Sequence, residues 1–106
     1  MKTWTLAAAC AAAFGTWPAA AQDSQTAQLL ARNLAATCAN CHGTNGQALG
    51  DMKQLAGVSA EKIIAAVADY KSGAQPATIM HQIAKGYTDE QIRLVAGYFA
   101  AQPARK

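Results

Sequence analysis

The pentapeptide CANCH at residues 38–42 constrains this chain more than any other feature. It places Cys38 and Cys41 three positions apart, and His42 directly follows the second cysteine. A structural zinc site, a redox-active disulfide and a covalently attached haem are the three kinds of chemistry that use such a cluster. A structural zinc site needs four Cys or His ligands. Beyond residue 21 only His81 could be added, and His42 is poorly placed to join both cysteines on one metal.

A redox disulfide is typical of a strand–helix–strand context. No segment of this chain shows convincing strand alternation, and a disulfide leaves His42 without a role. Haem gives all three residues a function, because C-x-x-C-H is the attachment signature of c-type haem. The two thiols add to the vinyl groups of haem as thioethers, and the local turn brings the histidine under the iron. We therefore predict one haem c, held by Cys38 and Cys41, with His42 as the proximal ligand.

The start of the chain has the layout of a secretory signal peptide. Lys2 supplies the positive charge, residues 4–17 are uncharged and mostly apolar, and Ala19 and Ala21 give the small-residue pattern of a cleavage site. A membrane anchor is the alternative, but a spanning helix needs roughly 20 apolar residues. We predict that residues 1–21 are removed and that the protein is periplasmic, where bacteria attach c-type haem.

The remaining residues, 22–106, make one small domain. They carry eight basic and six acidic side chains, with no basic cluster for nucleic acid and no second apolar run for a membrane. The small positive charge favours an acidic protein partner. Much of the apolar content is alanine, and a domain of this size buries only a modest fraction of its surface. A haem would supply the apolar bulk that such a core lacks.

The hydrophobic pattern predicts an all-α fold with about four helices. The expected helices cover residues 25–37, 60–71 and 77–85, and a last one that starts after Thr88. Between the first two, the glycine-rich residues 43–57 read as a loop.

Local signals define where these helices begin and end. Asp23 or Ser24 is the expected cap of the first helix, and Ser59 that of the second. Thr88 with Gln91 forms a capping box. Two glycines are the expected helix stops, Gly73 and Gly86. The expected buried stripe of the last helix consists of Ile92, Val95, Ala96 and Phe99.

A second axial ligand should lie well downstream of His42. Met52 is only ten residues on, which is a short reach around the edge of the macrocycle. Met80 follows a whole helix, so we predict it as the distal ligand, with neighbouring His81 as the alternative. A thioether opposite histidine raises the reduction potential and suits electron transfer. If no side chain filled this position, the iron could bind small ligands in a sensor or a catalyst.

Longer strings resemble one family. CANCH at 38–42, LAG at 55–57, YKSG at 70–73 and MHQIAKGYTDEQIRLVAGYFA at 80–100 resemble a class I c-type cytochrome of the c4 and c553 type. IAKGY at 83–87 and AGYF at 96–99 are most similar to the cytochrome subunit of flavocytochrome c sulfide dehydrogenases.

The resemblance implies that the first and last helices cross beside the haem. Leu30 or Leu34 would contact Tyr98 and Phe99, and Gly97 would let the helices approach closely. Many members carry a proline in the loop before LAG, and its neighbourhood accepts a hydrogen bond from the proximal histidine. Residues 51–57 contain no proline. Another backbone carbonyl must therefore accept this bond.

The resemblance also implies a carrier of single electrons that is no enzyme on its own. The first hypothesis is a subunit that accepts electrons from a sulfide-oxidising flavoprotein. The second is a free carrier between membrane complexes and a terminal oxidase or reductase. A five-coordinate gas sensor or peroxidase is the third, and it differs from the others in leaving Met80 unbound.

Overall fold

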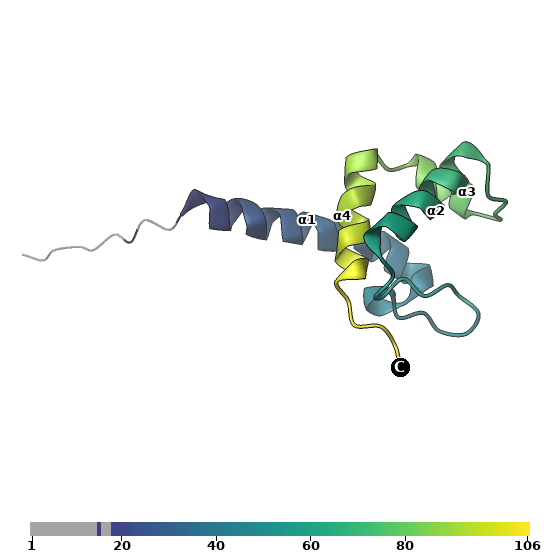
Figure 1. The fold of residues 1–106 in the computed structure, drawn as a ribbon, viewed down its shortest axis with the longest axis horizontal. Coiled ribbons are helices and arrows are strands. Elements are labelled where there is room, and N and C mark those ends of the chain that lie inside the picture. The colour runs from purple at the N-terminus through teal and green to yellow at the C-terminus, as the bar shows by residue number, and fades with distance from the viewer. Residues whose placement is uncertain (1–14, 16–17) are drawn as a thin grey trace, which may run out of the picture.

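The computed structural model describes Gly15 and residues 18–106, and this part of the chain is all-α, as predicted (Figure 1). Its elements are α1 (Ala19–His42), the short 3₁₀ helix η1 (Thr44–Gly46), α2 (Ala60–Ser72), α3 (Met80–Lys85) and α4 (Asp89–Ala100). No helix in the described residues is both long and apolar enough to span a membrane. Most of the predicted signal peptide, residues 1–21, lies outside the described residues, and its cleavage after Ala21 stays a prediction.

The first helix is longer at both ends than the predicted 25–37. It begins at Ala19 behind Pro18, and no side chain caps it, so the expected caps Asp23 and Ser24 are wrong. Alanine and glutamine dominate its first turns, and both are good helix formers, so nothing interrupts the helix there. It ends only at Gly43, whose φ of +82° lies outside the helical region. The CANCH motif is therefore helical throughout.

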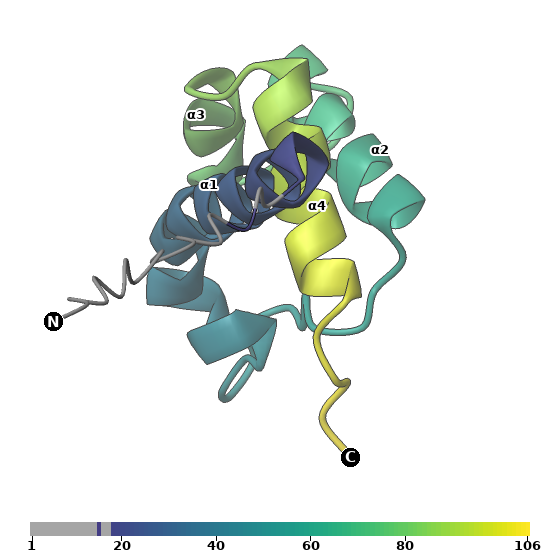
Figure 2. The same ribbon diagram turned by 90° about the vertical axis from the view of Figure 1, so that its left-hand side faces the viewer.

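Helices α1 and α4 cross and pack together (Figures 1 and 2). The buried stripe predicted for α4 is confirmed, and its members are Ile92, Val95, Ala96 and Phe99. The buried residues of α1 are Ala31 and Ala35. Leu34 is half-buried against this core, whereas Leu30 is 48% exposed. The alanine side of α1 thus makes the contact, because small side chains let two helices come close.

The predicted role of Gly97 in this crossing is wrong. Gly97 is exposed, and a Cβ atom built on it meets nothing within 4 Å. The neighbouring Ala96 is fully buried instead. The helix rotation that buries Phe99 turns Gly97 away from the core.

In the second half of the protein, α2 packs against both α3 and α4. Helix α2 ends at Gly73 in the left-handed conformation, as predicted, but the Ser59 side chain makes no capping hydrogen bond. Helix α3 starts at Met80 instead of residue 77, because Ile79 has a non-helical φ of −136°. The capping box of α4 is confirmed, since Thr88 Oγ1 accepts from Gln91 N at 3.1 Å and Gln91 Oε1 from Thr88 N at 2.9 Å.

The loop of residues 43–57 folds onto the C-terminal end of α4. Its Gly46 carbonyl accepts from both Leu55 N and Ala56 N at 3.0 Å, which closes the loop. Gly57 N donates to Phe99 O at 2.9 Å, and Tyr98 Oη donates to Asn45 Oδ1 at 2.6 Å. Helix α4 therefore holds the loop that follows the CANCH motif.

Replacing Gly46 by alanine is expected to lower the free energy of unfolding by about 2–4 kcal/mol. Gly46 has φ +77°, and an added Cβ would lie 2.7 Å from Phe99 Cδ1 and 2.8 Å from Ala56 N. Gly97→Ala is the matched control, because its Cβ enters open space on a helix and should stabilise by about 0.5–1 kcal/mol. Urea unfolding of the two variants measures the difference. Equal stabilities would contradict the crowded environment of Gly46.

Candidate haem-binding site

The three residues of the predicted attachment site share one face of α1. Cys41 and His42 are three and four positions after Cys38, which brings all three side chains together on a helix. Cys38 is half-buried and Cys41 is exposed, and neither forms a disulfide within the described structure. Gly43 then turns the chain away with a φ of +82°, and a glycine is needed here because a Cβ atom would overlap the Gln47 carbonyl oxygen. The last helical turn thus presents two thiols and an imidazole to one side.

The surroundings of the thiols fit neither alternative to haem. Burial raises the pKa of the Cys38 thiol, and Cys41 adds to this increase. A redox-active C-x-x-C pair needs the opposite, a lowered thiol pKa. In the described part of the chain, no three Cys, His, Asp or Glu side chains come together as a possible metal site. Cys38, Cys41, His42 and His81 therefore do not form the four-ligand site that zinc requires.

The imidazole of His42 is held by a backbone carbonyl. Its Nδ1 atom lies 2.8 Å from Lys53 O. A carbonyl oxygen only accepts, so Nδ1 carries the proton, and in the neutral ring Nε2 keeps its lone pair. This is the tautomer of a histidine that binds a metal through Nε2. The expected backbone acceptor lies in the stretch 51–57, and it needs no proline because only the carbonyl is used.

Met52 and Met80, the two candidate distal ligands, lie in different parts of the structure. Met52 is 46% exposed and directly precedes Lys53, so it sits on the loop behind the His42 ring. Met80 is half-buried at the first position of α3. In both views α3 lies above the C-terminal end of α1, whereas the 43–57 loop lies at or below it (Figures 1 and 2). This placement favours Met80 over Met52.

His81 is half-buried, and its Nδ1 atom is buried without a hydrogen-bond partner among the described residues. The side chain is thus directed into the protein at least in part. The arrangement leaves both Met80 and His81 near the start of α3, and the choice between them stays a prediction that mutation can test.

The apolar surface of the described residues fits a haem. The core has ten buried hydrophobic residues, and six of these are alanines, so large side chains fill little of it. Large apolar side chains are exposed on the 43–57 loop and directly before Met80. These are Leu49 at 70%, Met52 at 46% and Ile79 at 58%. A flat apolar macrocycle bound next to His42 would cover surface of this kind.

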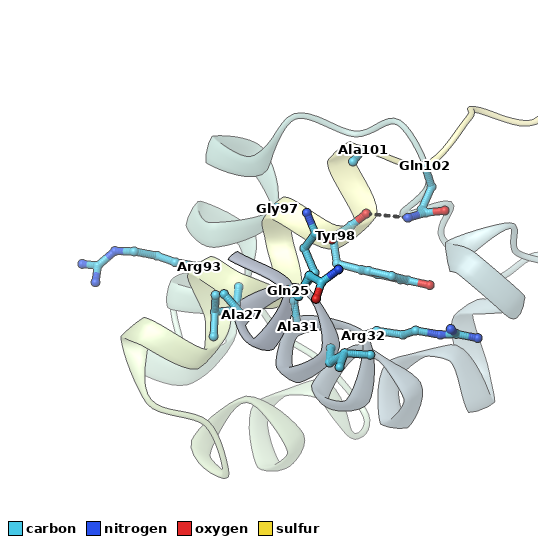
Figure 3. Close-up of a pocket in the computed structure, with 12 residues that line it drawn as sticks. Gln25, Ala27, Ala31, Arg32, Arg93, Gly97, Tyr98, Ala101 and Gln102 are labelled. Carbon is cyan, nitrogen blue, oxygen red and sulfur yellow. Dashed lines mark hydrogen bonds between the residues drawn. The ribbon is translucent and has the colours of Figure 1, made fainter. Parts of the chain in front are cut away.

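An open groove of about 840 Å³ lies elsewhere, between α1 and α4 (Figure 3). None of Cys38, Cys41, His42 and Met80 lines it. Figure 3 shows Arg93 and Arg32 extending from opposite ends of the groove. It is therefore a surface feature separate from the haem site.

Sequence reasoning missed Lys53 as the partner of His42, because a backbone carbonyl leaves no side-chain signal. It also missed Gln54, whose Oε1 atom accepts from Ala48 N at 2.9 Å next to that carbonyl. The sequence gives no hint of this role, because only the folded loop shows that Gln54 is half-buried and close to Ala48.

Comparisons with known proteins identify the family of this chain. The family model for cytochrome c matches residues 27–102. The cytochrome subunit of sulfide dehydrogenase from Chlorobaculum tepidum is 44% identical over 66 residues, which cover 62% of this chain and 60% of that protein. Cytochrome c-554(548) from Halomonas halodenitrificans is 36% identical over 70 residues, 62% of this chain and 84% of the relative.

A thiosulfate dehydrogenase electron acceptor from Stutzerimonas stutzeri is 38% identical over 72 residues. These cover 66% of this chain and 33% of that protein. The chain thus spans less than two thirds of the sulfide dehydrogenase subunit and about a third of this acceptor.

Proposed function

The chain belongs to the cytochrome c family and therefore carries a covalently bound haem c, and we propose that it holds this haem through thioethers at Cys38 and Cys41. His42 and Met80 are the axial ligands in this proposal. The observation that carries it is the hydrogen bond from His42 Nδ1 to Lys53 O, at 2.8 Å. This bond leaves Nε2 free for the iron, on the same helix face as both thiols.

The bound haem supplies a one-electron couple, Fe(III)/Fe(II). Each protein group has a separate task around it. The thioethers fix the macrocycle, and the Lys53 carbonyl orients the His42 ring and raises its basicity. Met80 supplies a weak thioether donor that raises the reduction potential. With His42 and Met80 both bound to the iron, no place would remain for a substrate, so the chain alone would transfer electrons and catalyse no reaction.

The electron donor we propose is a sulfide-oxidising flavoprotein, with this chain as its cytochrome subunit in the periplasm. The relative from C. tepidum supports this assignment, since it is named as the cytochrome subunit of a sulfide dehydrogenase and is 44% identical. The strings IAKGY at 83–87 and AGYF at 96–99 support it as well. The second candidate is a freely diffusing carrier. It is favoured by cytochrome c-554(548), of whose length the match covers 84%.

Size and visible absorption of the native protein distinguish these two functions. We expect haem and flavin bands to elute together in one peak well above the mass of this chain. The sample is the protein gently purified from its own periplasm. A haem band in a peak near 10 kDa, without flavin, would instead favour the free carrier. A peak without haem bands would refute the proposed site.

A further inference from the structure

The chain continues beyond α4, and this C-terminal segment contacts the 43–57 loop at both of its ends. Near the start of the loop, Gln47 Nε2 donates to Pro103 O at 3.3 Å and Arg105 Nη1 donates to Ala48 O at 3.0 Å. At its end, a Cβ atom built on Gly57 would lie 2.8 Å from Ala104 Cβ. Figure 1 shows the segment leaving α4 beside the loop.

Ala48 connects this segment to the histidine. Its carbonyl accepts from Arg105, while its N–H donates to Gln54 Oε1 at 2.9 Å. Gln54 directly follows Lys53, whose carbonyl receives the hydrogen bond from His42 Nδ1. Three hydrogen bonds, linked through the backbone of Ala48 and through Gln54 with its peptide bond to Lys53, thus lead from Arg105 to the proximal ligand.

Residues 49–53, between Ala48 and Gln54, are stabilised by few contacts of their own. All five residues from 49 to 53 are exposed, and within them the backbone makes one long hydrogen bond, Met52 N to Leu49 O at 3.4 Å. Ala48 is buried, and Gln54 is half-buried with its Nε2 atom fully covered. The position of the Lys53 carbonyl therefore depends on the two ends of this stretch.

We propose that Arg105 and Gln54 are positioning residues for the axial histidine. Arg105 anchors Ala48, Gln54 closes the stretch from 48 to 54, and together they hold the Lys53 carbonyl at hydrogen-bonding distance from His42 Nδ1. The inference rests on the proposed role of His42 as a haem ligand. Neither residue touches the haem in this proposal.

The electronic consequence follows from the geometry. Hydrogen bonds weaken steeply as their distance and angle depart from the optimum. A looser Lys53 carbonyl makes His42 a weaker electron donor, because the hydrogen bond raises the basicity of the ring. A weaker donor stabilises Fe(III) less, so the reduction potential rises. At the same time the Nδ1 proton becomes more accessible to water.

Arg105→Ala and Gln54→Leu test this in the haem-loaded protein. Lys106→Ala is the matched control, because it removes the same charge from the neighbouring residue. NMR of the reduced, diamagnetic protein follows exchange of the His42 Nδ1 proton with solvent, and voltammetry gives the potential. We expect about tenfold faster exchange, which corresponds to about 1.4 kcal/mol, and a higher potential in both variants. Arg105→Lys, which keeps a donor, should recover part of each effect.

An exchange rate and a potential equal to those of Lys106→Ala, in either variant, would overturn the proposal. So would a parallel increase in amide exchange throughout α2 and α4, because that result indicates general loosening of the fold. Failure of the proposed function has a different signature. In that case the protein with its original sequence would lack the absorption spectrum of haem c, or its NMR spectrum would show that the His42 ring is not bound to the haem iron.

Discussion

Met80→Ala is expected to lower the reduction potential by on the order of 0.1 V or more, within the roughly 0.8 V that axial ligands span. The physical reason is the loss of the thioether. A weak sulfur donor opposite histidine favours Fe(II), and water or another oxygen or nitrogen ligand in its place favours Fe(III). The ferric protein should also lose the long-wavelength absorption band of methionine-ligated haem. Voltammetry and visible absorption of the purified variant measure both changes.

Met52→Ala is the matched control for this experiment. Met52 is 46% exposed on the loop whose Lys53 carbonyl holds His42, so its removal should leave both readouts nearly unchanged. His81→Ala tests the neighbouring candidate, whose buried Nδ1 atom has no partner among the described residues. If the spectrum and potential follow His81 or Met52 instead, the ligand assignment is wrong. If none of the three variants changes them, the five-coordinate sensor or peroxidase gains support.

The parts of the fold that sequence predicted well depend on neighbours within one helical turn. Thr88 and Gln91 satisfy each other across the first turn of α4, and so their pattern alone fixes where the helix begins. The stripe that ends at Phe99 has the same local origin, since its spacing follows the helical period. The haem was predicted just as directly from the CANCH motif, because two thiols and an imidazole at this spacing have few uses, and the match to the cytochrome c family supports this cofactor.

The errors arose where distant contacts decide the outcome. Leu30 or Leu34 was expected to contact α4. Only Leu34 packs against the core, and the buried residues of α1 are the smaller Ala31 and Ala35. Gly97 was expected to let α1 and α4 approach closely, but the helix rotation that buries Phe99 turns Gly97 outward. The role of the Lys53 carbonyl could not be predicted for a different reason, since every residue offers the same backbone acceptor. Only the folded loop shows which carbonyl meets the histidine.

The double variant Cys38→Ala with Cys41→Ala is expected to lose the haem and most of the cooperative fold. Six of the ten buried hydrophobic residues in the described chain are alanines, and Phe99 is the only large side chain that is completely buried. Truncating one buried phenylalanine to alanine costs about 3–5 kcal/mol, and a haem is several times larger than a phenyl ring. The whole stability of a domain is only about 5–15 kcal/mol. Loss of the haem should therefore remove most or all of it.

Far-UV circular dichroism and thermal unfolding of the double variant measure this effect. For the double variant we expect weak helicity at 25 °C and no cooperative transition on heating. Cys41→Ala alone keeps the thioether at the half-buried Cys38. This variant should retain the haem and stay folded, but with a lower free energy of unfolding. A compact double variant with full helicity and a sharp transition would contradict the account. In that case the alanine-rich contact of α1 with α4 would stabilise the fold by itself, and the haem would bind to a domain that folds without it. Among the described residues, Phe99 is the one large side chain that is completely buried, and this argues for loss of the fold.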